Sequence, residues 1–382
     1  MINPMKRAKN LYEKLVSYAN LRIAIQEVDK THRWRKGHKP NPCTAWVEET
    51  IEERIKELRN IIENGFVPKE PRVSKRWDAS ALKYRIIKEP AQYPDQYIHH
   101  ALIQVLQPVM MKGMDNFCCG SIKDRGTAHA RKAIQKWMKN DIKGTKYCLC
   151  ADIRHFYDSL KPEVVTDRMK QLIKDYRVLD LIERINQNGI SIGAYTSQWF
   201  ANTTLQPLDR LIRESGYCKH YVRYMDNLTI FGSNKRKLRY LREDIQKWLN
   251  EHSLELKGDW QIFPVKKRLP MAVGFRYGRG YTLIRKHNLF RIKRAMNEYW
   301  KFKAKGEDMT FEFAAGLLSR LGQLMHCNNR NIYEKLFKGE HVVHELKKTV
   351  KEYAFEFKMT WEQYKIIRQF RQGGVNGFNR NT

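Results

Sequence analysis

The chain has 382 residues, of which 42% are hydrophobic, and this is enough to bury a sizeable core in about two or three subdomains. Lysine and arginine number 72 against 41 aspartate and glutamate residues, which gives a formal net charge of +31. A charge of this size indicates a polyanionic partner such as nucleic acid. No apolar run approaches the roughly 18 residues of a membrane span, so the sequence excludes an integral membrane protein with helical spans.

The seven cysteines indicate neither a disulfide framework nor a zinc site. The closely spaced pairs Cys118–Cys119 and Cys148/Cys150 lack histidine partners at the spacing of zinc ligands. The N-terminal stretch MINPMKRAKNLYEKL has no apolar segment typical of a signal peptide. We therefore expect a cytoplasmic protein with reduced thiols and no cysteine-bound metal.

Residues 1–70 are expected to form a helical N-terminal extension. Its apolar residues recur at helical spacing and stop before Gly65: Trp46, Ile51, Ile55, Leu58 and Ile62. The stretch KYRIIKEP, from Lys83 to Pro90, is typical of a basic strand followed by a stop. A helix is expected next, with one apolar face made by Ile98, Leu102, Val105 and Leu106.

Two short runs in the middle of the chain are expected to form strands that end near an aspartate. The first is KYCLCADIRHFYDSL from Lys146, which reaches Asp152 after an apolar run. The second is YVRYMDNLTIFG, in which β-forming residues flank Asp226 and Asn227. An Asp-Asn pair in this position is typical of a tight hairpin turn, and an ordinary hairpin is one interpretation of it.

The remaining elements complete an α+β fold class. The stretch TSQWFANTTLQPLDRLIRESG, residues 196–216, is expected to form one helix that ends at Gly216. Another helix is expected from about Lys237 to Glu251, followed by short strands near residues 260–264 and 271–277. Helical spacing returns beyond Arg285. The order is a helical arm, a mixed α+β centre and a helical C-terminal part.

Asp152 and Asp226 lie far apart in the sequence, so only the fold could bring them together. Adjacent carboxylates repel, and the pKa of each rises unless a cation lies between them. Mg²⁺ prefers oxygen ligands and keeps positions open for water and phosphates. Two such ions about 3.5–4 Å apart stabilise the attacking and leaving oxygens of a phosphoryl transfer. The pattern indicates a nucleotidyl transferase, with buried or turn aspartates of structural role as the alternative.

The ordered motifs resemble those of reverse transcriptases from about residue 70 to 345. The matching stretches are LKYRIIKEPAQYPDQYIHHAL, FCCGSIKDRGTAHARKAI, ADIRHFYDSL, GISIGAYTSQWFAN, YMDN, LELKGDWQIFPV and AVGFRY. The second departs from the family's Gly-Phe-Arg-like start, because this chain has Cys119-Gly120-Ser121. The resemblance implies a right-hand polymerase with fingers and an antiparallel palm sheet in residues 71–285, a helical thumb in 286–345 and a helical tail in 346–382.

The resemblance also implies roles for individual residues. Asp152, Asp226 and Asn227 would form the catalytic set. Two Mg²⁺ ions, for which Mn²⁺ could substitute, would be held by Asp152, Asp226 and the backbone of Ile153. The nucleotide would be bound by Lys83, Arg85, Phe156, Tyr157, Ile192, Gly193 and Gln198, and the candidate general acid is Lys257. Tyr157 would act as an aromatic gate that excludes a ribose 2′-hydroxyl and selects deoxynucleotides.

One departure concerns the subtype. Many reverse transcriptases have Gln-Gly where this chain has Ile192-Gly193, followed after three residues by Ser197-Gln198. This pattern resembles the enzymes of diversity-generating retroelements and some bacterial antiphage defence reverse transcriptases. The helical arm and the stretch LIRKHNLFRIKRAM also resemble the former. The resemblance implies a protein of a bacterial or phage-infected cell that copies a dedicated non-coding or template-repeat RNA into cDNA, with an accessory protein or a second copy as further partners.

The other departure is Asn227, where the family usually has aspartate. An amide keeps an oxygen ligand but removes a charge, so it holds a second metal less strongly. Three alternatives remain open: an active natural variant, a weakened polymerase used as an RNA-binding scaffold, and an engineered inactive form. We expect a retained mechanism because Asp152 and Asp226 are both present. An RNA-directed RNA polymerase is disfavoured by Tyr157, since such enzymes need room for the 2′-hydroxyl.

Overall fold

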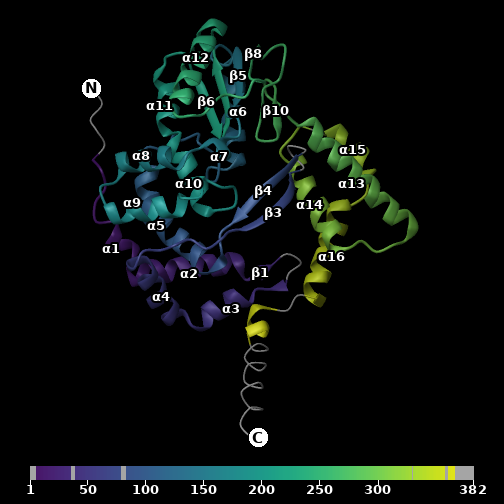
Figure 1. Ribbon diagram of the computed structural model, residues 1–382. Coiled ribbons are helices and arrows are strands. Elements are labelled where there is room, and N and C mark those ends of the chain that lie inside the picture. The colour runs from purple at the N-terminus through teal and green to yellow at the C-terminus, as the bar shows by residue number, and fades with distance from the viewer. Residues whose placement is uncertain (1–5, 36–38, 79–82, 329, 358–359, 366–382) are drawn as a thin grey trace.

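The middle of the chain forms the central sheet, a four-stranded antiparallel sheet in the order β6–β7–β5–β8 that lies in the upper part of the view in Figure 1. The computed structural model describes residues 6–35, 39–78, 83–328, 330–357 and 360–365. The strands are β5 (Tyr147–Asp152), β6 (His220–Tyr224), β7 (Asn227–Gly232) and β8 (Gln261–Pro264). β-branched and aromatic residues favour these strands. The predicted antiparallel palm sheet is confirmed.

Both faces of this sheet are covered. Because side chains alternate along a strand, Leu149 points to one face and Cys148 to the other. The first face packs with α11 (Gln206–Glu214) and α12 (Lys235–Glu251) in the largest core cluster. The second packs with α6 (Thr127–Asn140) and a three-stranded sheet made of β9 (Met271–Ala272), β10 (Phe275–Tyr277) and β11 (Thr282–Ile284). Burial of both faces explains why these strands are mainly apolar.

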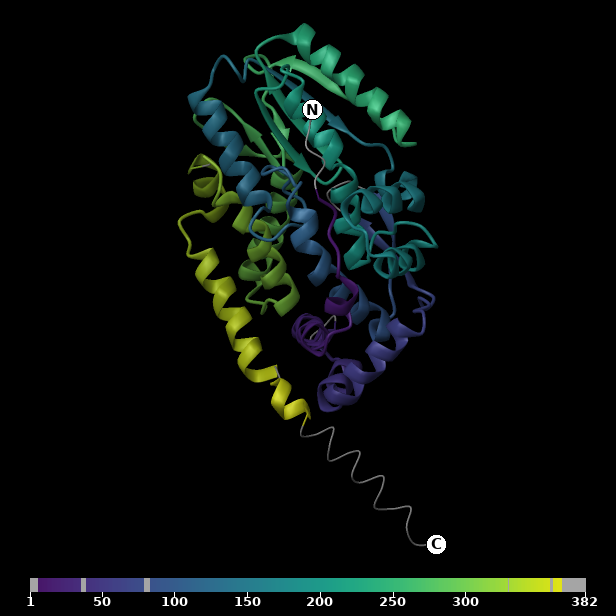
Figure 2. The same cartoon turned by 90° about the vertical axis from the view of Figure 1, so that its left-hand side faces the viewer.

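A layer of helices continues the largest core cluster away from the sheet. At its centre, α5 (Tyr97–Met111) contacts α10 (Tyr195–Thr204) on one side and α2 (Tyr18–His32) on the other. Figure 2 shows the N-terminal helices at the end of the molecule opposite α12. The layer also contains α1 (Tyr12–Leu15), α3 (Pro42–Glu49), α4 (Ile51–Glu63), α7 (Phe156–Ser159), α8 (Pro162–Leu172), α9 (Tyr176–Asn186) and the π-helical turn η1 (Gln92–Gln96).

Two hairpins lie outside the central sheet. The long one pairs β3 (Arg72–Asp78) with β4 (Lys83–Glu89) and extends from the helical layer toward the C-terminal helices (Figure 1). The predicted basic strand that begins at Lys83 is therefore confirmed. The short one pairs β1 (Trp34–Arg35) with β2 (Lys39–Pro40) beside the N-terminal helices.

The C-terminal helices have a hydrophobic core of their own. They are α13 (Lys286–Lys305), α14 (Phe311–Leu324), α15 (Arg330–Phe337) and α16 (Val342–Phe357). The thumb was expected to end at residue 345, but α16 continues through this position. Val342 and Leu346, on either side of it, are both buried in the core of these helices. Residues 366–382 of the predicted tail lie outside the described residues.

The expectation of one helix over residues 196–216 is wrong. α10 ends at Thr204 and α11 begins at Gln206, with Leu205 between them. Pro207 lies in the first turn of α11, where the N–H that proline lacks has no helical partner in any case. The break turns α11 toward α12, which it contacts. In the described part of the chain, no helix is long and apolar enough to cross a membrane.

Candidate active site

The candidate catalytic residues meet at one edge of the four-stranded sheet. Asp152 is the last residue of β5, and the register places it directly opposite Asn227, the first residue of β7. Asp226 lies in the turn between β6 and β7, where Met225 has a φ of 56°. The Ile153 N–H donates a hydrogen bond to the Asp226 carbonyl oxygen at 3.2 Å, which ties this turn to the end of β5. The fold thus joins two aspartates that are distant in sequence.

The Asp226 carboxylate lies close enough to Asp152 to oppose its ionisation. Burial, followed by the charge of Asp226 and a hydrogen bond with it, raises the pKa of Asp152 to about 7. Among the described residues, Asp152 Oδ1 is buried and has no hydrogen-bond partner. Asp226 Oδ1 accepts a hydrogen bond from Asn227 Nδ2 at 3.2 Å. A cation would relieve both the repulsion and the missing contact at Asp152.

These groups fit a magnesium site. Mg²⁺ is usually held by one or two carboxylates and completes its shell with water and substrate phosphates. Asp152 and Asp226 would supply the carboxylates, and Asn227, opposite Asp152 in the strand register, would supply an amide oxygen. The Ile153 backbone stays a predicted further ligand. Within the described ranges, no three His, Cys, Asp or Glu side chains gather into a larger metal-binding cluster. A metal here would therefore depend on this one pair of carboxylates.

A pocket of about 550 Å³ opens beside Asp152 and Asn227. One wall is the sheet face that carries Asp152 and Asn227. The lining also includes Arg268, which stacks on Phe263 of β8 (Gln261–Pro264), and Arg285 and Asn288 at the start of α13. Arginines in a pocket that also contains an aspartate suit a ligand that carries phosphates and binds through a metal ion.

Tyr157 lies at the start of α7, just after the catalytic strand. Burial, and then the charge of Asp226, raise the pKa of its hydroxyl, so the phenol stays neutral near the catalytic turn. Phe156, predicted to contact the nucleotide, is only 3% exposed and belongs to the main core. Its ring centroid lies 5.6 Å from that of Tyr157. Phe156 is therefore a core residue whose ring packs beside that of Tyr157.

The β3–β4 hairpin carries the two basic residues predicted to bind the nucleotide. Arg85 Nε donates to Asp78 Oδ2 at 2.6 Å. The Arg85 side chain is 39% exposed. Lys83 is exposed and lies opposite Asp78 in the hairpin register. Both basic residues therefore lie on β4, and their contact with a nucleotide stays a prediction.

The loop before α10 packs against the same hairpin. The Ile192 carbonyl oxygen accepts a hydrogen bond from the Lys88 N–H at 2.8 Å. Gly193 has a φ of 127°, and a Cβ there would lie 2.6 Å from the Lys88 carbonyl oxygen. Only glycine fits this combination of backbone angle and close approach. Gln198 follows on the exposed side of α10, where a ligand can reach it.

Lys257 borders the pocket beside Asp152. Its N–H donates to the Asp152 carbonyl oxygen at 2.8 Å, and its Nζ donates to Asp259 Oδ2 at 2.6 Å. The hydrogen bond with Asp259 raises the pKa of Lys257. A raised pKa makes the ammonium a weaker proton donor, so Lys257 would have to leave Asp259 to act as the predicted general acid.

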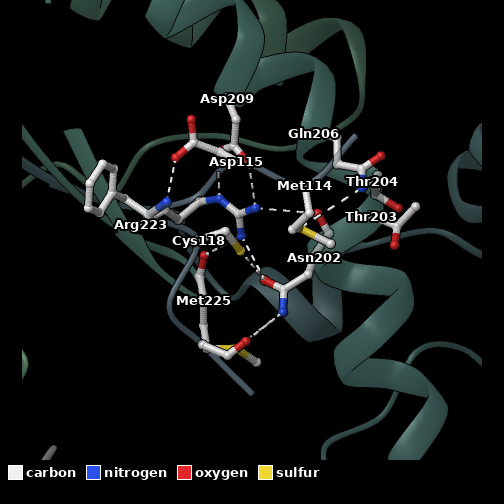
Figure 3. Close-up of polar contacts among 12 residues, drawn as sticks. Met114, Asp115, Cys118, Asn202, Thr203, Thr204, Gln206, Asp209, Arg223 and Met225 are labelled. Atoms are coloured by element: carbon white, nitrogen blue, oxygen red, sulfur yellow. Dashed lines mark hydrogen bonds and ion pairs between the residues drawn. The ribbon is translucent and has the colours of Figure 1, made fainter. Parts of the chain in front are cut away.

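A fully buried arginine holds the turn that carries Asp226 (Figure 3). Arg223 Nε and Nη2 form a bidentate ion pair with the two carboxylate oxygens of Asp209, each at 2.7 Å. Nη1 donates to the Met225 carbonyl oxygen at 3.1 Å and to Asn202 Oδ1 at 2.8 Å. Nη2 also donates to the Asn202 carbonyl oxygen at 3.3 Å. All the N–H donors of the guanidinium are thereby used.

The same network reaches the loop before α6. The Cys119 N–H donates to the Arg223 carbonyl oxygen at 2.8 Å, and Asn202 Nδ2 donates to the Gly120 carbonyl oxygen at 2.8 Å. A Cβ on Gly120 would lie 2.7 Å from the Met225 backbone nitrogen, so the loop and the catalytic turn are in direct contact. Residues 119–120 therefore support the turn from one side and Arg223 supports it from the other.

Sequence reasoning did not identify Arg223, Asp209 or Asn202. The sequence did contain one signal of a buried arginine. Arg223 lies two residues after Tyr221, so both side chains are on the same face of β6, and both are buried. A buried arginine needs a carboxylate partner, since a charge is almost never buried alone. The partner itself was not predictable, because Asp209 lies on a different element and only the fold brings it to Arg223.

Two solved structures of telomerases are similar to this chain at low identity. Telomerase from Candida albicans, in complex with the TWJ fragment of telomeric RNA, is 10% identical with a TM-score of 0.46 over 82% of this chain and 71% of that chain. Apo telomerase from Candida tropicalis, truncated from its C-terminal domain, is 11% identical with a TM-score of 0.41 over 62% of this chain and 58% of that chain. No curated protein matches the sequence.

The reverse transcriptase family gives the match that decides the assignment. The family described as "Reverse transcriptase (RNA-dependent DNA polymerase)" matches residues 68–259. This segment is half of the chain and contains Asp152, Tyr157 and Asp226 together with the β3–β4 hairpin and the strands of the central sheet up to β7. The chain therefore belongs to the reverse transcriptase family.

Proposed function

We propose that this chain is an active RNA-directed DNA polymerase that extends a primer with deoxynucleotides copied from an RNA template. The observation that carries the proposal is the meeting of Asp152 and Asp226 at one sheet edge, beside a pocket of about 550 Å³. The net charge of +31 supports a nucleic-acid ligand, because phosphate contacts dominate such binding.

The carboxylates are proposed to bind divalent metal. Asp152, Asp226 and the Ile153 carbonyl would hold two Mg²⁺ ions, or Mn²⁺ in their place, and the Asn227 amide would give a weaker contact. When bound, the ions would supply positive charge to the attacking and leaving oxygens of the transfer. The buried Asp152 Oδ1 without a partner supports this assignment.

The other residues bind and orient the nucleotide in this proposal. Arg85 and Lys83 attract the triphosphate from the hairpin, and Arg85 exchanges its contact with Asp78 for phosphate oxygens. Tyr157 packs against the sugar, while Gln198 faces the nascent base pair from α10. Lys257 can approach the leaving group once it releases Asp259.

Tyr157 is expected to exclude ribonucleotides. Tyr157→Ala removes a ring that would clash with a 2′-hydroxyl, so incorporation of ribonucleotides should rise by at least about tenfold, the effect of roughly 1.4 kcal/mol. Deoxynucleotide use should fall only modestly. Tyr157→Phe is the matched control, because it keeps the ring and should keep the discrimination. Primer extension with single nucleotides measures the ratio, and an unchanged ratio in Tyr157→Ala would place the gate elsewhere.

Restoring a carboxylate at position 227 is expected to strengthen metal binding. In Asn227→Asp, a third acid faces Asp152 across the strand pair, so divalent metal should bind more tightly. The metal-free protein should become less stable, because the hydrogen bond from Asn227 Nδ2 to Asp226 is replaced by repulsion between carboxylates. A magnesium series followed by thermal unfolding and by primer extension measures both effects.

The same experiment distinguishes a working polymerase from a scaffold. A retained mechanism predicts synthesis by the chain, with a lower magnesium requirement in Asn227→Asp. The second candidate function is an RNA-binding scaffold. One observation favours it: Asn227 has an amide in place of a metal-binding carboxylate. Unchanged magnesium affinity together with no synthesis by either form would support the scaffold.

We infer further that the enzyme is of the diversity-generating retroelement type. The Ile192-Gly193 pattern supports this, and the loop that carries it packs against the hairpin through Lys88. A defence enzyme that copies a dedicated non-coding RNA is the alternative within the family. The proposed partners are the template RNA, its cDNA, deoxynucleotides, and an accessory protein or second copy, in a bacterial cytoplasm.

Sequencing the nucleic acid that co-purifies with the chain tests this subtype. A template-repeat RNA whose complementary DNA differs mainly at template adenines would support the retroelement type. A single structured non-coding RNA with faithful cDNA would support the defence type and overturn our inference. RNA without any complementary DNA would favour the scaffold.

A further inference from the structure

Two thiols lie in contact on β5, on the strand that ends in Asp152. Cys148 and Cys150 are two residues apart, so alternation places both on the sheet face that carries Asp152. Their sulfur atoms are 3.6 Å apart. This is far longer than the roughly 2.05 Å of a disulfide bond, and both cysteines are free thiols.

The pair can be reached from the active-site pocket. Cys150 is partly exposed and lines the pocket of about 550 Å³ together with Asp152. Cys148 is fully buried one step further along the strand, in the cluster that also contains Val222 and Phe231. A reagent that enters the pocket therefore meets Cys150 first and can then reach the Cys148 sulfur beside it.

The adjacent Cys118 and Cys119 do not offer the same arrangement. Cys118 Sγ donates to Asn202 Oδ1 at 3.5 Å (Figure 3), whereas Cys119 Sγ donates to the Phe117 carbonyl oxygen at 3.3 Å. The two sulfurs thus face different partners, and both side chains are buried. They provide an internal comparison for any reagent that needs two converging thiols.

The spacing on the strand favours a bridging atom over a direct S–S bond. Two residues of a strand span about 6.6 Å, which is near the upper end of the roughly 4.4–6.8 Å between Cα atoms joined by a disulfide. Closing a disulfide would therefore distort β5. One soft atom placed between the two sulfurs needs little movement, and thiolates prefer soft partners. Trivalent arsenic is such an atom and can bond two thiols at once.

We propose that Cys148 and Cys150 form a dithiol site for trivalent arsenicals, and that filling it blocks nucleotide transfer. An organoarsenic oxide, R–As=O, forms one As–S bond with each thiol, and its oxygen leaves with the two thiol protons as water. Arsenic and sulfur keep their oxidation states. The organic group then occupies the pocket beside Asp152. The block rests on the proposed polymerase function, whereas formation of the adduct does not.

Phenylarsine oxide added to the full chain tests the site. Mass spectrometry under native conditions should show one arsenical bound per chain, removed by a dithiol and retained in a matching concentration of monothiol. Cys148→Ala and Cys150→Ala should each weaken binding by roughly 10²-fold, since a second tethered ligand adds about that much. Cys218→Ala and Cys118→Ala are the controls and should bind as the parent does. Binding that survives both Cys148→Ala and Cys150→Ala would overturn the site.

Activity and competition then test the block. Phenylarsine oxide should stop primer extension by the parent. The Cys148→Ala variant should extend a primer equally well with and without the reagent. A pre-bound primer and template should slow adduct formation, because the proposed polymerase function places them at the same pocket. Adduct formation together with undiminished extension would overturn the block but not the dithiol site. If no form extends a primer, the polymerase proposal fails, and the mass measurements on the parent and the cysteine variants still decide the site.

Discussion

Asp152→Asn and Asp226→Asn are each expected to slow nucleotide incorporation by roughly 10³-fold, the effect of losing about 4 kcal/mol of metal-held charge stabilisation. Asparagine keeps the size of the side chain but removes the charge that would bind the ions. In the described structure, one other carboxylate lies near Asp152 and Asp226 at this sheet edge. It belongs to Asp259, which is already paired with Lys257. Single-turnover primer extension measures the loss.

The matched control is Asp244→Asn, which changes an exposed carboxylate on α12 and should leave the rate unchanged. RNA binding should also stay intact in Asp152→Asn and Asp226→Asn, because phosphate contacts by basic residues supply most of it. Either catalytic variant working at the parental rate would contradict the assignment of the active site.

Asp152→Asn is expected to make the metal-free protein more stable while it slows nucleotide incorporation. Burial and Asp226 raise the pKa of Asp152 to about 7, so its ionised form destabilises the fold above that pH. The gain in stability should therefore be full above about pH 7 and should shrink as the pH falls toward the ordinary range of an aspartate near 4. Thermal unfolding in a chelator across this pH range measures it.

Arg223→Met is expected to lower the free energy of unfolding by about 3–5 kcal/mol, because it leaves the buried Asp209 carboxylate without its partner. Burial alone would lower the pKa of Arg223, but Asp209 more than offsets this and holds the guanidinium charged. Arg223→Lys keeps a charge but lacks the planar fork, so it cannot bond Asp209, Asn202 and Met225 together. Urea unfolding measures the stability of both variants.

The Arg223→Lys variant also tests whether this network positions the catalytic turn. Its folded fraction should need more magnesium for half-maximal extension, because the Met225 carbonyl loses its donor next to Asp226. Arg213→Lys is the matched control, since Arg213 pairs bidentately with Asp115 but is 30% exposed and makes no contact with the turn in the described structure. Equal magnesium requirements in Arg223→Lys and Arg213→Lys would limit Arg223 to a role in stability.

The sequence was sufficient for features that depend on local pattern. Strand-forming residues on both sides of Asp226 and Asn227 predicted the β6–β7 hairpin, and the apolar run before Asp152 predicted β5. The register then places these residues side by side. The family resemblance supplied the expectation that they meet, which hydrophobic pattern alone could not give.

Features that depend on contacts between distant elements were not predictable. The ion pair of Arg223 with Asp209 joins a strand to a helix, and no local pattern selects that acid among the 41 acidic residues. Phe156 and Tyr157 are neighbours in the chain, yet Phe156 is buried in the main core while Tyr157 is only partly buried against it, and this difference depends on packing that the sequence does not show. The prediction of a single helix over residues 196–216 was wrong. The apolar spacing continues past Pro207, but a proline is also common in the first turn of a new helix, and here it begins α11.

The proposed polymerase activity is tested most directly by primer extension with the purified chain on a defined RNA template with a DNA primer, magnesium and deoxynucleotides. We expect DNA complementary to the RNA, made from deoxynucleotides in preference to ribonucleotides, and about 10³-fold slower synthesis by the Asp226→Asn variant. Product of equal yield from Asp226→Asn, or no product from either the chain or Asn227→Asp over a full magnesium series, would contradict it.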